Sequence, residues 1–309
     1  MAIDHLNTNP GSAPKLLSTR HHDAIVELLC DEIPSNLFQL CWLGNHGVRP
    51  LGQPDLFSFR GYPVDQDKLG AVSLVITGRL LLIYARTPDL AEAFGRWYRD
   101  RGMRFEHVVS PTSSVEPFWH AYSGPQDGGD IRARLNRGQS MYVLEPNAWS
   151  AEDSAAAGST VPDGLRYATN DDMEDVYAAS ARMHHEETLE DPIQTKPREF
   201  RRHVRHRINS DRSFVWYDGD ELIFKADVSA QGHFGVQISG VYTTPERRGQ
   251  GVATRGMHHI CRHLFDREVP RIVLYFNDDN GAARRVYERV GFSYYTDYQT
   301  IFVADPATS

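Results

Sequence analysis

Apolar residues in the second half of the chain recur with two periods, which predict alternating helices and strands. Met173, Val176, Tyr177, Ser180 and Met183 fall on one face of a helix. Further helices are predicted at 200–209, 251–267 and 280–290, and strands at 165–168, 213–217, 221–230, 233–243 and 271–275. We expect residues 292–303 to supply two closing strands. This order predicts a mixed α/β fold, in which an antiparallel meander precedes a βαβ crossover.

The first half carries a weaker version of the same pattern. Helices are predicted at 22–30, 37–43, 88–101 and 115–122, and strands at 56–60, 72–76, 79–85, 105–109 and 140–144. The similar order leaves open whether the halves are an internal duplication. We expect a disordered tail at 1–14, a first domain at 15–146, a small and polar linker at 147–164, and a second domain at 165–305.

Composition narrows the class of protein. A chain of 309 residues is long enough for two domains, and its net charge of -8 argues against a nucleic-acid surface while suiting a cationic small substrate. Cys30, Cys41 and Cys261 are scattered, so neither a disulfide framework nor a zinc site is expected. No apolar run reaches the roughly 18 residues of a membrane helix, and the polar start of the chain does not look like a secretory signal. We therefore expect a cytoplasmic protein that binds neither membrane nor nucleic acid.

The most informative segment is the turn at 247–253, Arg-Arg-Gly-Gln-Gly-Val-Ala, between a predicted strand and a predicted helix. The first amides of a helix lack partners, and the helix dipole adds positive charge there. Glycines at 249 and 251 allow those amides to turn inward and an anion to approach. The turn predicts a phosphate site; the alternative is a tight turn with solvated arginines.

A second pattern follows at 280–292, where the spacing is N-x-x-A-x-x-x-Y-x-x-x-G-F. Together with the R-x-x-G-x-A spacing at 248–253, it resembles the GNAT superfamily of acyl-CoA-dependent N-acetyltransferases. The whole chain is similar to two-domain bacterial members whose N-terminal domain is uncharacterised. The resemblance implies a GNAT fold in the second half and a degenerate GNAT-like domain in the first. There residues 86–89 stand in place of the glycine turn, so we expect that the first domain has lost the phosphate site.

The resemblance also implies acetyl-CoA, or another acyl-CoA, as co-substrate, and no metal. The pyrophosphate would bind the amides at the start of the helix, and the pantetheine arm would lie between two strands that separate. The residues expected to bind the co-substrate are Val241, Tyr242, Thr243, Arg248, Gly249, Gln250, Gly251, Val252, Ala253, Thr254, Asn280 and Tyr287.

Tyr287 lies two helical turns beyond Asn280, and the resemblance makes it the expected acid that protonates the departing CoA thiolate. The alternative is a core aromatic residue. The base is open, because many members carry a carboxylate on the strand before the turn and this chain has Gln237 there. The candidates are Asp227, His233 and the adjacent pair Glu186 and Glu187.

Each candidate base has a structural alternative. Asp227 alternates with Lys225, which is also the pattern of an ion pair within a strand. His233 adjoins a turn, as surface histidines often do. Glu186 and Glu187 belong to an acidic helix end that either receives a cationic amine or is simply solvated. The neighbouring histidines 184 and 185 point to different sides of a helix, so we expect no metal there.

Two further features bear on partners. The basic run at 196–207 is most simply a solvated helix face paired with local acids, although it could attract the CoA 3′-phosphate, an acidic partner or RNA. None of the cysteines lies at either motif, so no nucleophile for a covalent acyl-enzyme is evident and we expect direct transfer in a ternary complex. The expected acceptor is a small-molecule or peptide amine, and the protein is a possible homodimer. The alternatives are an aminoacyl-tRNA-dependent transferase and a non-catalytic acyl-CoA sensor.

Overall fold

The computed structural model describes residues 13–50, 56–64, 68–76, 78–124, 131–149 and 164–304. They form two compact units, Met1–Met141 with Tyr295–Ser309 and Tyr142–Tyr294. Strands β6 (Ala133–Leu144) and β12 (Ser293–Val303) each contribute residues to both units. The predicted tail at 1–14 and the predicted linker at 147–164 lie for the most part outside the described residues.

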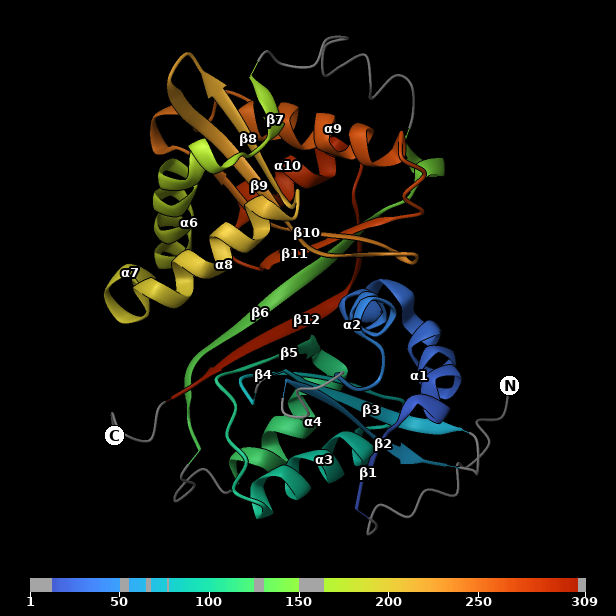
Figure 1. Ribbon diagram of the computed structural model, residues 1–309. Helices are drawn as coiled ribbons and strands as arrows, with labels where there is room; N and C mark the ends of the chain where they lie inside the picture. Colours follow the sequence, from blue (N-terminus) through green and yellow to red (C-terminus); the bar gives the residue numbers. More distant parts are fainter. Residues whose placement is uncertain are drawn as a thin grey trace. The chain divides into compact units, whose positions relative to one another are not determined.

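The first unit is a sheet with helices on both faces. Its strands run in the order β1 (Lys15–Leu16), β2 (Phe57–Pro63), β3 (Leu69–Ile76), β4 (Leu80–Ala85), β5 (His107–Pro111), β12 and β6. Helices α1 (His22–Leu29) and α2 (Ile33–His46) cover one face, and α3 (Pro88–Asp100) and α4 (Thr112–Ser123) cover the other (Figure 1).

The core of the first unit rests on close contact between α3 and α4. Phe94 and Tyr98 from α3 and Phe118 and Tyr122 from α4 are fully buried, and the rings of Phe118 and Tyr122 stack with centroids 5.2 Å apart. Burying each such side chain contributes about 1.5–3 kcal/mol. Gly95 lets the two helices approach, because a Cβ atom there would lie 2.4 Å from the carbonyl oxygen of Phe118.

The second unit is also a sheet between two helical layers. After the end of β6 its strands run in the order β11 (Ile272–Asn277), β10 (Gly235–Thr243), β9 (Glu221–Gly232), β8 (Ser213–Asp218) and β7 (Leu165–Tyr167). Helices α9 (Val252–Phe265) and α10 (Gly281–Val290) cover one face. Helices α6 (Met173–Thr188) and α8 (Pro197–Asn209) cover the other, joined by α7 (Pro192–Thr195) (Figure 1).

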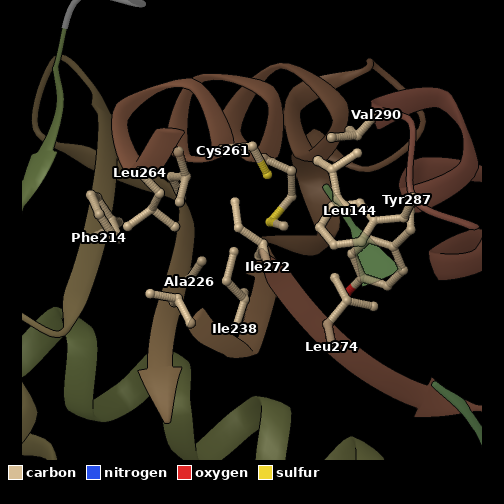
Figure 2. Close-up of a cluster of buried hydrophobic side chains, with 14 of the residues drawn as sticks. Leu144, Phe214, Ala226, Ile238, Cys261, Leu264, Ile272, Leu274, Tyr287 and Val290 are labelled. Carbon is tan, nitrogen blue, oxygen red and sulfur yellow. The ribbon is translucent and has the colours of Figure 1, made fainter. Parts of the chain in front are cut away.

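Strand alternation assigns the side chains of the second unit to these layers. Phe214, Ala226 and Ile238 pack with Cys261 and Leu264 of α9 (Figure 2). The intervening positions, such as Val215 in β8, face the layer of α6 and α8. Lys225 and Asp227 in β9 share this second face by the same alternation, which places two charged side chains beside α6 and α8.

The mixed α/β fold predicted from the sequence is confirmed, and the helices and strands named from periodicity are present with shifted ends. The prediction of two closing strands at 292–303 is wrong. The structure has one continuous strand, β12, because this segment contains no glycine or proline to form a turn. Among the helices of the described residues, none is both long and apolar enough to cross a membrane.

We predict opposite effects for alanine at two helical glycines. Gly95→Ala forces α3 away from α4 and should lower the free energy of unfolding by about 1–3 kcal/mol. Gly44→Ala in α2, where no atom lies within 4 Å of the added Cβ, should raise it by about 0.5–1 kcal/mol through helix propensity. Denaturant unfolding measures both, and equal effects of the two substitutions would contradict the packing argument.

Candidate functional site

The site begins where two parallel strands of the second unit separate. β10 and β11 pair only at Val236 with Ile272 and at Gln237 with Val273. Beyond these positions β10 stays paired with β9 as far as Thr243. The strand separation that the family resemblance implies is therefore present, and it leaves one side of the β10 backbone without a strand partner.

The predicted turn follows β10 after the short 3-10 helix η5 (Pro245–Arg247). Gly249 and Gly251 have φ angles of 75° and 74°, in the left-handed region that favours glycine, and α9 begins at Val252. No atom lies within 4 Å of the Cβ position of Gly249. Within the described part of the chain, the amides of residues 249–254 donate no hydrogen bond. Six successive donors at a helix N-terminus are suited to bind a phosphate group.

Arg248 connects this turn to α6. Its Nη2 atom donates to both carboxylate oxygens of Glu186, at 3.0 and 2.9 Å, and its Nε donates to the carbonyl oxygen of Thr243 at 3.0 Å. The guanidinium also lies 5.4 Å from the centre of the Tyr242 ring. Glu186, considered above as a candidate base, is thus the ion-pair partner of the turn arginine.

Tyr287 lies in the core beside the separated strands. Its ring is 7% exposed and packs against Phe276 and Phe292 (Figure 2 shows it beside Leu274 and Val290). Asn280 caps the helix that carries it, because its side-chain oxygen accepts a hydrogen bond from the amide of Ala283 at 3.0 Å. Burial, with the nearby charge of Glu187, raises the pKa of Tyr287 well above its usual value, so the phenol stays protonated at neutral pH.

Glu187 occupies the last turn of α6, which ends at Thr188 and is capped by Leu189 with a φ of 60°. Its side chain is accessible to solvent, yet desolvation by the surrounding protein raises its pKa, and Lys225 opposes that shift. Burial and the charge of Glu187 also raise the pKa of Tyr275 to about 12. The structure therefore brings Glu187 within electrostatic range of Tyr287, Tyr275 and Lys225.

Asp227 is enclosed in an ion-pair network. Its Oδ2 atom accepts from Lys225 Nζ at 2.7 Å and from Arg207 at 3.1 Å, and its Oδ1 accepts from Ser213 at 2.7 Å. The side chain is 1% exposed. Burial opposes its ionisation, but the charges of Lys225 and Arg207 outweigh this effect and hold its pKa below the usual range. The ion pair that the sequence left open is thus present.

His233 is an exposed residue in the turn between β9 and β10. Within β10, six residue steps separate the end of this turn at Gly235 from Val241, which corresponds to roughly 20 Å along a strand. The structure therefore does not bring His233 together with Glu187 and Tyr287.

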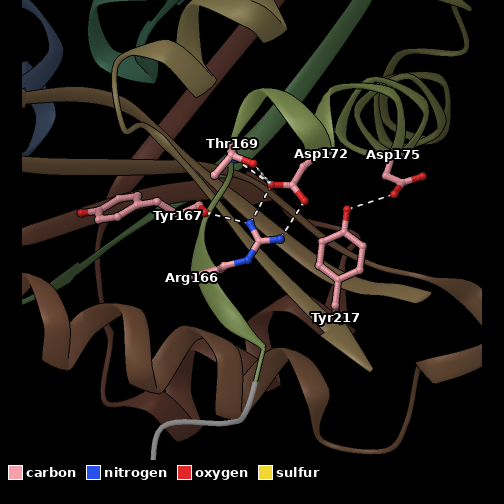
Figure 3. A network of polar contacts seen from close by, with 6 residues as sticks. All are labelled: Arg166, Tyr167, Thr169, Asp172, Asp175 and Tyr217. Atoms are coloured by element: carbon pink, nitrogen blue, oxygen red, sulfur yellow. Dashed lines mark hydrogen bonds and ion pairs between the residues drawn. The ribbon is translucent and has the colours of Figure 1, made fainter. Parts of the chain in front are cut away.

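A polar network fixes the N-terminal end of α6, the helix that carries Glu186 and Glu187. Arg166 in β7 donates to both oxygens of Asp172, at 2.6 and 2.8 Å, and the amide of Thr169 donates to Asp172 at 2.7 Å (Figure 3). One turn further, Tyr217 donates to Asp175 at 3.0 Å. These contacts attach the helix to the sheet at its start.

Sequence reasoning missed two residues of this region. Gly240, with a φ of 62°, lies in a bulge of β10. Tyr275 lies in β11, and the charge of Glu187 raises its pKa. A glycine inside a strand is a known signal of a bulge, so Gly240 could have been found. No sequence signal connects Tyr275 to a residue of α6.

The first unit repeats the strand separation but satisfies the exposed amides itself. β4 and β5 also pair in parallel at only two positions, Leu80 with His107 and Leu81 with Val108. Beyond them, the buried hydroxyl of Ser110 accepts from the amide of Ile83 at 2.7 Å, and Ser114 accepts from the amide of Ala85 at 3.2 Å.

The helix that follows β4, α3, also begins differently from α9. α3 begins with Pro88, which has no amide hydrogen, and Arg86 before it is bound to Asp31. This segment offers neither a glycine turn nor the full row of donors that precedes α9.

Residues 173–292 match the model of the acetyltransferase (GNAT) family. The GCN5-related N-acetyltransferase from Sphaerobacter thermophilus covers 95% of this chain with 95% of its own, at 15% identity and a TM-score of 0.55. A tandem GNAT protein from the clavulanic acid biosynthesis pathway covers 95% of this chain with 98% of its own, at 13% identity and a TM-score of 0.54. The chain therefore has the fold of two GNAT-like units in tandem.

Two curated relatives add a local similarity. The mycothiol acetyltransferases of Mycobacterium sp. strains JLS and MCS are each 37% identical to this chain over 59 residues, or 18% of its length. The match spans 20% of each relative, so the chain aligns with about a fifth of their length.

We predict that Asp172 makes stability depend on pH. Arg166 and the Thr169 amide hold the pKa of Asp172 at about 2, against an ordinary value of 3.8. A lowered pKa stabilises the folded state above the ordinary value, and that contribution is lost as the pH falls from about 4 to about 2. Screening at the half-exposed Arg166 limits it to about 1–2 kcal/mol. Denaturant unfolding of Asp172→Asn should lack this acid-dependent loss.

The matched control is Asp171→Asn at an exposed neighbouring position, which should retain the wild-type pH dependence. An unchanged pH dependence in Asp172→Asn would show that the network does not stabilise the start of α6.

Proposed function

We propose that the second unit is an acyl-CoA-dependent N-acyltransferase that uses acetyl-CoA and transfers the acyl group directly to an amine. The observation that carries this proposal is the row of amides at 249–254, which donate no hydrogen bond within the described chain and follow a strand separated from its neighbour. The glycines at 249 and 251 and the helix dipole make this turn fit a pyrophosphate.

Other groups of the chain fit the remainder of such a co-substrate. The backbone of Val241 and Tyr242 lies on the strand that has lost its partner, so an extended amide-containing arm can bond to it. The Thr243 carbonyl is already an acceptor for Arg248, which leaves its second lone pair for a ligand. The bound acyl-CoA would supply the activated thioester.

The proton transfers are assigned to two residues of the site. A new bond joins the amine nitrogen to the acyl carbon as the carbon–sulfur bond breaks. Glu187 accepts the proton that the amine loses, directly or through water, and Tyr287 donates a proton to the leaving sulfur. A carboxylate with a raised pKa is a better base near neutral pH than an ordinary one. A protonated phenol is a competent acid.

The other candidates suit this role less well. Asp227 is buried, both of its oxygens are engaged, and its lowered pKa makes it a weak base. Glu186 is committed to Arg248. His233 lies at the opposite end of β10 from the turn.

The acceptor class follows from the charge around Glu187. Carboxylates at the end of α6 favour a cationic amine, and the local similarity to mycothiol acetyltransferases supports a small-molecule acceptor. The raised pKa of Glu187 favours an enzyme over an acyl-CoA sensor, because a sensor has no need of a base.

The first test is CoA release from acetyl-CoA over a panel of primary amines. We expect turnover with at least one cationic small amine and a reduction of about 10²-fold in kcat for Tyr287→Phe. The acyl-CoA Kd of this variant should stay within twofold, because the phenyl ring keeps its packing. Unchanged kcat would remove Tyr287 from the acid role, and absence of both binding and turnover in the wild type would refute the function.

The second test concerns the base. Glu187 must be ionised to accept a proton, so kcat/KM should fall as the pH falls through its pKa, which lies above the ordinary value of 4.5. Glu187→Gln should abolish this acid limb and lower kcat/KM by about 10²–10⁴-fold. Glu174→Gln, at the other end of α6, is the control and should keep the limb. An acid limb that persists in Glu187→Gln would exclude Glu187 as the base.

A further inference from the structure

Lys225 is a fully buried cation at the centre of the second unit. It lies in the middle of β9, and its side chain is 0% exposed. Its Nζ atom donates to Asp227 Oδ2 at 2.7 Å and to the carbonyl oxygen of Gly240 at 3.0 Å. Burial of an ammonium group is costly unless it is paired and hydrogen-bonded. Lys225 meets that condition through one carboxylate, that of Asp227, and one backbone carbonyl of the neighbouring strand, that of Gly240.

That carbonyl belongs to the bulge of β10. The register between β10 and β9 shifts between Ser239 and Tyr242, and Gly240 within this segment has a φ of 62°. A Cβ atom at Gly240 would lie 2.5 Å from Asp227 Oδ2 and 3.1 Å from Lys225 Nζ. The bulge therefore closes directly onto the ion pair, and only glycine fits there without displacement.

The bulge at Gly240 lies just after the point where β10 separates from β11. Pairing with β11 ends at Gln237, three residues earlier. A bulge bends its strand and increases the local twist, so it carries Val241 and Tyr242 along a direction separate from β11. The same backbone then enters the turn that begins α9.

We propose that Lys225 is a positioning residue of the transferase: its ammonium holds the bulge at Gly240, which sets the backbone that binds the acyl-CoA arm, and it places a positive charge on the sheet face covered by α6, the helix that carries Glu187. This proposal rests on the proposed function. It assigns Asp227 the task of holding Lys225 rather than that of a base.

The charged residues near Lys225 agree with an electrostatic effect of its ammonium group on Glu187. Burial lowers the pKa of Lys225; the charges of Asp227 on its own strand and of Glu187 in α6 oppose this shift and favour the ammonium form, while Arg207 from α8 acts in the other direction. The charge of Lys225 lowers the pKa of Glu187 and so counteracts desolvation.

Glu186 in α6 also raises the pKa of Glu187, and the charge of Glu187 in turn raises the pKa values of Tyr275 in β11 and Tyr287 in α10. Lys225 is the cation among the charges that shift the pKa of Glu187. Its removal should therefore move the acid limb of kcat/KM toward higher pH.

The test uses the double variant Lys225→Met/Asp227→Asn in the full chain, which removes both charges so that neither is left buried alone. We expect the KM for acetyl-CoA to rise about tenfold, as for the loss of one or two backbone hydrogen bonds to the arm, and the acid limb to move to higher pH. Arg207→Met is the control. It removes the third charge of the network without touching the Gly240 carbonyl, and should leave the KM for acetyl-CoA within twofold.

A second variant separates geometry from charge. Gly240→Ala pushes on the ion pair but keeps its charges, so it should raise the KM for acetyl-CoA and leave the acid limb in place. The proposal is overturned if either variant, with a wild-type melting profile, keeps the wild-type KM, or if the double variant keeps the wild-type acid limb. A wild-type protein that neither binds nor consumes acetyl-CoA would instead refute the proposed function.

Discussion

The early separation of β10 from β11 is the constraint on which the rest of the second unit depends. Backbone amides and carbonyls inside a protein need hydrogen-bond partners, and β10 loses one set of partners after Gln237. The bulge at Gly240 and the buried Lys225 stabilise this arrangement from the opposite side. The strand then leads into a glycine turn with further unpaired donors. Strand and turn together present backbone groups that suit an extended anionic ligand.

The first unit shows that strand separation alone does not make such a site. Its parallel strands also pair at only two positions, yet Ser110 and Ser114 supply the acceptors that the amides beyond them need. Pro88 removes a donor at the start of the following helix. In the first unit, serine hydroxyl groups thus occupy the backbone amides beside the separated strands. In the second unit, the corresponding backbone groups are suited to a ligand. We infer one acyl-CoA site for each chain.

The parts of this account that depend on local chemistry could be predicted from the sequence. Gly249 and Gly251 predict a turn with positive φ angles. The alternation of Lys225 with Asp227 predicts an ion pair on one face of the sheet. The contact of Lys225 with the carbonyl of residue 240 could not be predicted, because the pattern of side chains in a sequence does not show which backbone carbonyl a side chain reaches on a neighbouring strand. The raised pKa of Glu187 was equally hidden, since it depends on how α6 packs against the sheet.

The central claim is that the amides of 249–254 bind the pyrophosphate and that the first unit binds none. Backbone amide chemical shifts, followed during titration with CoA, test it directly. The account predicts shifts that saturate at one CoA per chain and are largest at 249–254, with none at Ile83, Ala85 or the start of α3. Equal shifts at those positions of the first unit, or no shift at 249–254, would contradict it.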